Sequence, residues 1–115
     1  MIGRRDRPTV IAFVVLAIGL VAVLVLAFSI RPYVAWLAAW SVVTFIAYAI
    51  DKAQARRGGW RIPEIVLHGL AIAGGAIGGW VGLLALHHKT RHPVFPLVLA
   101  IALTVQIVLG VAIGW

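Results

Sequence analysis

Cysteine is absent from this 115-residue chain, and carboxylates are scarce. The lack of cysteine excludes a disulfide framework, a thiolate metal site and a cysteine nucleophile. Three Asp/Glu stand against ten Lys/Arg, which gives a formal net charge of +7. The serines are Ser29 and Ser41, and neither lies in a glycine-flanked elbow of the kind that hydrolases use. Nucleophilic catalysis therefore has little support.

Apolar residues dominate what is present, at 63% of the chain with a mean hydropathy of +1.10. A water-soluble domain this small could not bury so much apolar surface, so the expected solvent is a lipid bilayer. The cations lie in short segments between apolar runs. That pattern fits membrane orientation and anionic lipid headgroups better than a nucleic-acid surface. We therefore expect the bilayer, including anionic lipids, as partner, with no nucleic acid and no cofactor.

The apolar runs predict an all-α, polytopic helical membrane protein with four transmembrane helices in one domain. A span needs about 20 residues. The basic start and Ala27-Phe28-Ser29 resemble a signal peptide, but the uncharged run is longer than the roughly 7–15 residues of a signal core, so we expect a retained helix. The predicted spans are about 9–30, 33–50, 65–86 and 94–115, with polar loops at 51–64 and 87–93.

One face of the second span carries aromatic and polar residues at helical spacing. These are Trp36, Trp40, Thr44, Ala47 and Asp51. We expect a packing face with interfacial anchors rather than a ligand-facing stripe.

The third apolar run is rich in glycine, and its small-xxx-small pairs predict close helix packing and a possible homo-oligomer. The packing glycines are Gly74, Gly75, Gly78, Gly79 and Gly82. His68 lies one helical turn beyond Glu64, just inside the apolar zone, which makes it a functional candidate. An ordinary histidine that pairs with Glu64 is the structural alternative.

Two topologies are compatible with the charges. Four straight spans place seven Lys/Arg on the side that holds both termini and three on the other side, which predicts cytoplasmic termini in an inner membrane. If 65–86 were instead a re-entrant hairpin, the count would be nine against one. Re-entrant backbone must be shielded by protein at membrane depth. Because so small a chain offers little shielding, the straight span is the favoured prediction for 65–86.

Three motifs together resemble a known family. Asp51-Lys52-x-x-Ala55 is followed by Arg61-Ile62-Pro63-Glu64, by the glycine-rich run and by His88-Lys89-Thr90. Over roughly residues 45–110 this pattern resembles the bacterial family called domain of unknown function 1294. The resemblance implies a small multi-pass membrane protein without an established activity. Some members carry an amino-terminal cold-shock domain. The first span stands in its place here, so no nucleic-acid role carries over.

The motif residues suggest a functional region without a defined reaction. The candidates are Asp51, Lys52, Arg61, Glu64, His68, His88, Lys89 and Thr90. The carboxylates could simply pair with neighbouring cations and pin the loop. Alternatively, Arg61, Lys89 and Arg91 are suitable partners for a phosphate-bearing lipid.

A metal site is disfavoured, although imidazoles suit zinc, copper or nickel and His87, His88 and His92 are clustered. Lys89 and Arg91 would repel a cation there. The sequence therefore predicts a structural or interaction protein whose basic loops contact anionic headgroups. A small transporter or channel subunit that uses His68 and Glu64 is one alternative. An enzyme embedded in the membrane and acting on a phosphate-bearing lipid is the other, and no catalytic residue is assigned.

Overall fold

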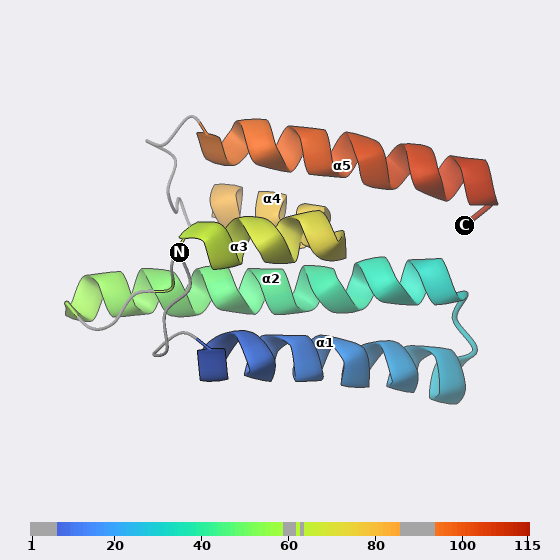
Figure 1. Cartoon of the computed structure of the whole chain (residues 1–115), viewed down its shortest axis with the longest axis horizontal. Coiled ribbons are helices and arrows are strands. Elements are labelled where there is room, and N and C mark those ends of the chain that lie inside the picture. The colour runs from blue at the N-terminus through green and yellow to red at the C-terminus, as the bar shows by residue number, and fades with distance from the viewer. Residues whose placement is uncertain (1–6, 59–61, 63, 86–93) are drawn as a thin grey trace.

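The computed structural model describes residues 7–58, 62, 64–85 and 94–115, and every regular element within them is helical (Figure 1). The predicted all-α fold is confirmed. The elements are α1 (Arg7–Phe28), α2 (Pro32–Arg57), α3 (Glu64–Leu70), the short π-helix η1 (Ala71–Gly75), α4 (Ala76–Ala85) and α5 (Val94–Ile113).

By length and composition alone, four helical segments could cross a membrane, at about the positions that the sequence predicts. They are Arg7–Phe28, Pro32–Gln54, Ile65–Ala85 and Pro96–Ile113. Their outer faces carry many exposed apolar side chains, of which Leu26 is the most exposed at 82%. In a bilayer such surface contacts lipid tails instead of water.

The turn between α1 and α2 is set by local backbone chemistry. Ser29 adopts a positive φ of 56°, and the N–H of Ile30 donates to the carbonyl of Leu24 at 3.1 Å. A left-handed residue directly after the last helical residue is a common helix ending, and this backbone hydrogen bond closes the end of α1. Pro32 then begins α2, where its missing N–H would have had no helical acceptor.

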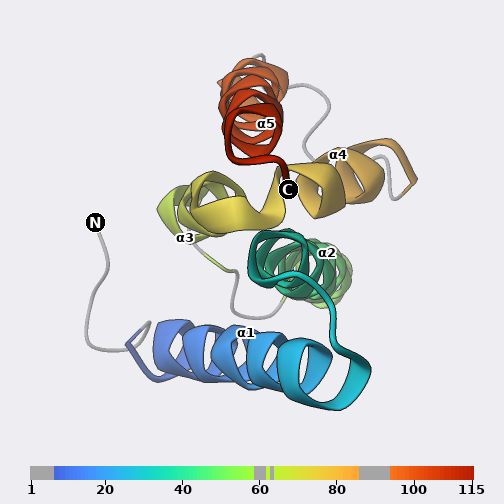
Figure 2. The ribbon, with the colours of Figure 1, turned by 90° about the vertical axis from the view of Figure 1, so that its right-hand side faces the viewer.

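α2 is the central helix of the bundle. Figure 2 shows α1 on one side of it and the pair α3 and α4 on the other, with α5 beyond that pair. α2 continues past residue 50, the predicted end of the span, to Arg57. Composition predicts where apolar character stops, whereas this helix ends at Gly58, whose positive φ of 66° suits a helix terminus.

The third apolar run is a helical hairpin. Gly74 has φ 154° and ψ −2° and interrupts the helix between α3 and α4. The N–H of Ile62, just before α3, donates to Oδ1 of Asp51 at 2.9 Å, and a Cβ on Gly82 in α4 would lie 3.0 Å from the ring of Tyr48. Asp51 and Tyr48 are one turn apart on α2, whereas a straight helix would separate residues 62 and 82 by about 30 Å.

The straight helix predicted for 65–86 is therefore wrong. The structure has a helical hairpin in its place, as the alternative prediction had it. The physical reason is twofold. Gly74 occupies a backbone conformation that residues with a side chain rarely adopt. In addition, α2 and α5 enclose the reversal (Figure 2), which gives the shielding that the small chain was expected to lack.

The hairpin divides the bundle into two unlike ends. At the end that we call the polar end, α1 begins, α2 stops, the hairpin enters and leaves, and α5 begins (Figure 1). At the far end lie the connection between α1 and α2 and the last residues of α5. The start of α1 and the end of α5 are thus at opposite ends, in contrast to the predicted common side, because the hairpin removes one crossing from the count.

Candidate functional site

The predicted packing face of α2 is the surface on which the hairpin lies. Trp40, Thr44, Ala47 and Asp51 are buried on it, and Trp36 is partly buried. The two indole rings are 5.5 Å apart between centroids. Nearer the polar end, the smaller residues leave room for close contact with α4. Trp36, Trp40, Thr44 and Asp51 on this stripe therefore contact the hairpin or the residue before it.

The glycines of the hairpin allow backbone contact with its neighbours. A Cβ on Gly75 would overlap the side chain of Thr44, and one on Gly78 would overlap the backbone carbonyl of Ser41. A Cβ on Gly79 would lie 2.5 Å from Leu99 of α5. All three glycines are buried. The glycines at 75, 78 and 82 face α2 and the one at 79 faces α5, so the hairpin backbone approaches both helices closely at these positions.

The reversal at Gly74 frees backbone carbonyls, and side chains from α2 and α5 bind them. Nε2 of Gln106 donates to the carbonyl of Ala71 at 2.7 Å. Nε1 of Trp36 donates to the carbonyl of Ala73 at 2.6 Å. The hydroxyl of Tyr33 in turn donates to the backbone carbonyl of Gln106 at 2.6 Å. Non-helical backbone at membrane depth requires such partners.

The hairpin enters the bundle but does not cross it. Its mouth is level with Asp51 and its tip with Trp36 and Trp40. At a rise of 1.5 Å per residue, these positions are about 16–22 Å apart along α2. A hydrocarbon core is about 30 Å thick.

Asp51 connects α2 to the entrance of the hairpin. Its carboxylate is completely buried and accepts the backbone N–H of Ile62. Ile62 itself is buried in the same core cluster as Tyr48. From the sequence, one interpretation of Asp51 is a charge pair that pins the loop, and the hydrogen bond to Ile62 is a direct contact by which Asp51 holds this segment.

Cations gather at the polar end. Arg7, Arg56 and Arg57 are exposed there and Lys52 is partly exposed. Nη2 of Arg57 donates to Oε1 of Gln54, one turn earlier in α2, at 2.9 Å. These four residues lie at the start of α1 and in the last turns of α2.

Several predicted site residues cannot be placed. Arg61, His88, Lys89 and Thr90 lie outside the described residues, as do His87 and His92 of the disfavoured metal cluster. Glu64 begins α3, but its side chain also lies outside the description. His68 is partly buried on α3. Within the described ranges, no group of three or more His, Asp or Glu could hold a metal ion.

Two residues at the hairpin tip were not among the predicted site residues. They are Trp36, which was expected only on the packing face, and Gln106 of α5. A buried side-chain amide in an otherwise apolar span requires hydrogen-bond partners. The position of Gln106 in the sequence therefore indicates that it contacts a polar group. The sequence could not show that its partners are the carbonyls of the third run.

Removal of the Asp51 carboxylate should loosen the hairpin entrance. We expect Asp51→Ala to lower the free energy of unfolding by about 1–3 kcal/mol, since the buried N–H of Ile62 loses its acceptor. Asp51→Asn keeps an oxygen at this position and is expected to lose less. Equilibrium unfolding in mixed micelles, followed by circular dichroism, measures both. If both variants unfolded with nearly the same free energy as the unchanged protein, this hydrogen bond would not hold the entrance.

Comparison with known proteins identifies relatives of the hairpin region. The family model described as "Protein of unknown function (DUF1294)" matches residues 41–95. The uncharacterized protein YsdA of Bacillus subtilis (strain 168) is 37% identical over 65 residues, which cover 56% of this chain and 73% of the relative. No solved structure matches. The family match begins within α2 and ends within the first turn of α5, so it contains the whole hairpin and excludes α1.

Proposed function

Because the chain belongs to the DUF1294 family of proteins of unknown function, we propose a role that rests on its geometry. The protein is an integral membrane protein that inserts a helical hairpin into the bilayer from its basic end. At that end it contacts anionic lipid headgroups as a structural or interaction protein. The observation that carries this proposal is the return of the hairpin to the end at which α2 stops.

Charge supports this orientation. Among the described residues, Arg7 begins α1, and Lys52, Arg56 and Arg57 lie in the last turns of α2, whereas Arg31 lies in the connection between α1 and α2. The first two places are at the polar end and the connection is at the far end (Figure 1). With the connecting segments assigned by topology, nine of the ten Lys/Arg of the sequence would fall on the polar side. Short cytoplasmic loops carry the excess of Lys/Arg. The polar end would therefore face the cytoplasm of a bacterial inner membrane, and the end of α5 would face the opposite side.

The same topology would bring the two polar parts of the family motif to one membrane face. Asp51 and Lys52 lie at the end of α2, and the chain leaves α4 and enters α5 at the same end. His88, Lys89 and Thr90 belong to that connection in the sequence. In a straight-span protein the two parts would be separated by the bilayer. A shared headgroup-binding region is thus supported by the hairpin.

Neutralising the end of α2 should weaken the attraction to anionic lipid. A basic residue near an anionic surface contributes about 1 kcal/mol. We therefore expect the double variant Arg56→Gln, Arg57→Gln to reduce enrichment of phosphatidylglycerol over phosphatidylcholine around the protein by about tenfold or more. Native mass spectrometry of protein released from mixed nanodiscs measures the retained lipids.

The matched control is Arg56→Lys, Arg57→Lys, which keeps both charges and should keep the enrichment. If the Gln variant retained phosphatidylglycerol as well as the unchanged protein, the headgroup role of this end would be wrong.

A further inference from the structure

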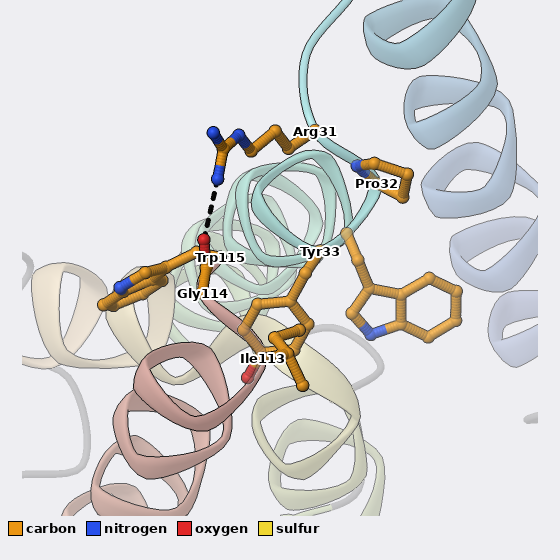
Figure 3. A pocket seen from close by; sticks show the side chains of 7 residues that line it. Arg31, Pro32, Tyr33, Ile113, Gly114 and Trp115 are labelled. Atoms are coloured by element: carbon orange, nitrogen blue, oxygen red, sulfur yellow. Dashed lines mark hydrogen bonds between the residues drawn. The ribbon is translucent and has the colours of Figure 1, made fainter.

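A pocket at the far end lies opposite the basic surface. Its volume is about 580 Å³, within the roughly 300–1,000 Å³ of small-molecule sites. It is open to the surroundings and lies between the start of α2 and the end of α5 (Figure 3). Its lining includes Arg31, Tyr33, Trp36, Ile113, Gly114 and Trp115. We call it the Arg31 pocket.

The Arg31 pocket lies beyond the hairpin tip, where the hairpin stops short of the far end. Trp36 lines the pocket and also donates to the carbonyl of Ala73 at the tip. In a bilayer, the space between α2 and α5 beyond the tip must be filled by some molecule, since protein interiors and lipid contacts do not leave large voids. The hairpin architecture thus creates the pocket and a need for an occupant.

The walls of the pocket suit an apolar group. Tyr33 and Trp36 are the lining residues with polar atoms near the tip, and both donate to backbone carbonyls, those of Gln106 and Ala73. Tyr33 and Trp36 therefore offer an occupant mainly the apolar surface of their aromatic rings. The rings of Tyr33 and Trp115 are tilted by 52° with centroids 6.4 Å apart, which adds a further aromatic wall.

The rim of the pocket suits an anion. Arg31 is exposed, and its Nη1 donates to the carbonyl of Gly114 at 2.7 Å (Figure 3). This contact holds the guanidinium across the gap between the two helices. A guanidinium has several N–H donors in a planar fork, and the fork matches the oxygens of phosphate. The hydrogen bond to the carbonyl of Gly114 therefore leaves most N–H donors of the Arg31 guanidinium available to an occupant.

A cationic rim above apolar walls selects an amphiphile with an anionic headgroup. We propose that the Arg31 pocket binds a phosphate-bearing lipid of the leaflet at the far end. Its phosphate contacts Arg31, and the adjoining part of its chain lies against Tyr33, Trp36 and Trp115. The site is distinct from the basic end and does not depend on the role proposed for that end.

The probe is a water-dispersed, short-chain phosphatidic acid, titrated into the full chain in a zwitterionic detergent. Tryptophan fluorescence reports binding, because Trp36 and Trp115 line the pocket. We expect saturable binding that weakens at least tenfold in Arg31→Gln and by a smaller factor in Arg31→Lys, which keeps the charge but not the planar fork. Short-chain phosphatidylcholine and inorganic phosphate alone should each bind at least tenfold more weakly than phosphatidic acid.

A second variant keeps the charge and fills the space. Ile113→Trp should abolish the response although Arg31 is intact, and Thr104→Val, at an exposed position of α5 outside the pocket, should leave it unchanged. Undiminished binding by Arg31→Gln would overturn the proposal, as would equal binding of phosphatidylcholine. If inorganic phosphate competed as well as the lipid, the pocket would be an anion site and not a lipid site, which would also overturn it.

Discussion

Gly78→Ala is expected to detach α4 from α2. The added Cβ would overlap the backbone carbonyl of Ser41, and a carbonyl within a helix cannot turn aside as a flexible side chain can. Overpacking of a well-packed contact typically costs 1–3 kcal/mol, and we expect about 3 kcal/mol or more here because the obstacle is backbone. Unfolding in mixed micelles, followed by circular dichroism, measures the loss.

The control for this prediction is Gly69→Ala in the same hairpin. Gly69 is exposed on α3, and a Cβ there meets no atom within 4 Å. Alanine is the better helix former by up to about 1 kcal/mol, so this variant should be as stable as the unchanged protein or slightly more stable. If Gly78→Ala and Gly69→Ala had the same small effect, the close contact between α4 and α2 would not exist in the membrane protein.

Gln106→Leu is the second variant with a large expected effect. The leucine fills a similar volume but cannot donate to the carbonyl of Ala71, which then lies at the hairpin tip without its side-chain donor. A buried polar group that loses its partner costs about 1–3 kcal/mol. We expect a loss of this size in the free energy of unfolding, together with faster hydrogen exchange of the amides at the tip.

Thr104→Val is the matched control on the same helix. The hydroxyl of Thr104 is exposed and donates at 2.8 Å to the carbonyl of Ala100, within its own helix. Its removal should change stability by a few tenths of a kcal/mol at most, as is usual for exposed positions without special contacts. A similar loss in both variants would mean that Gln106 does not support the reversal.

Much of the architecture follows from the sequence because the bilayer restricts what a chain can do. Apolar run length predicts the helices, Arg31-Pro32 predicts the turn before α2, and helical spacing predicts the buried stripe that contains Thr44 and Asp51. Each of these inferences uses neighbours in the chain. They hold because the physical cause is local.

The reversal in the third run has a cause that is not local. The run contains several glycines at helical spacing, and nothing in their pattern distinguishes Gly74, which breaks the helix, from Gly78, which packs within one. The choice depends on whether partners exist for the freed carbonyls. Trp36 and Gln106 supply them from α2 and α5. Pattern alone therefore favoured the straight span.

The candidate site was predictable only in part for a similar reason. Asp51 was recognised as a residue that holds the loop, but its bond to the N–H of Ile62 depends on where the hairpin begins. The Arg31 pocket had no signal in the sequence, because it exists only where a hairpin stops short of the far end.

The most direct test of the hairpin is the membrane side of Ala85, the exposed last residue of α4. The chain has no cysteine, so single cysteines at Ala85, Ala53 and Ser29 can be labelled one at a time in intact cells with a membrane-impermeant maleimide. Ala53 lies near the polar end and Ser29 at the far end, and both are exposed. The hairpin predicts that Ala85 is labelled from the same side as Ala53 and from the opposite side to Ser29. Labelling of Ala85 from the same side as Ser29 would mean that the third run crosses the membrane, and would contradict this account.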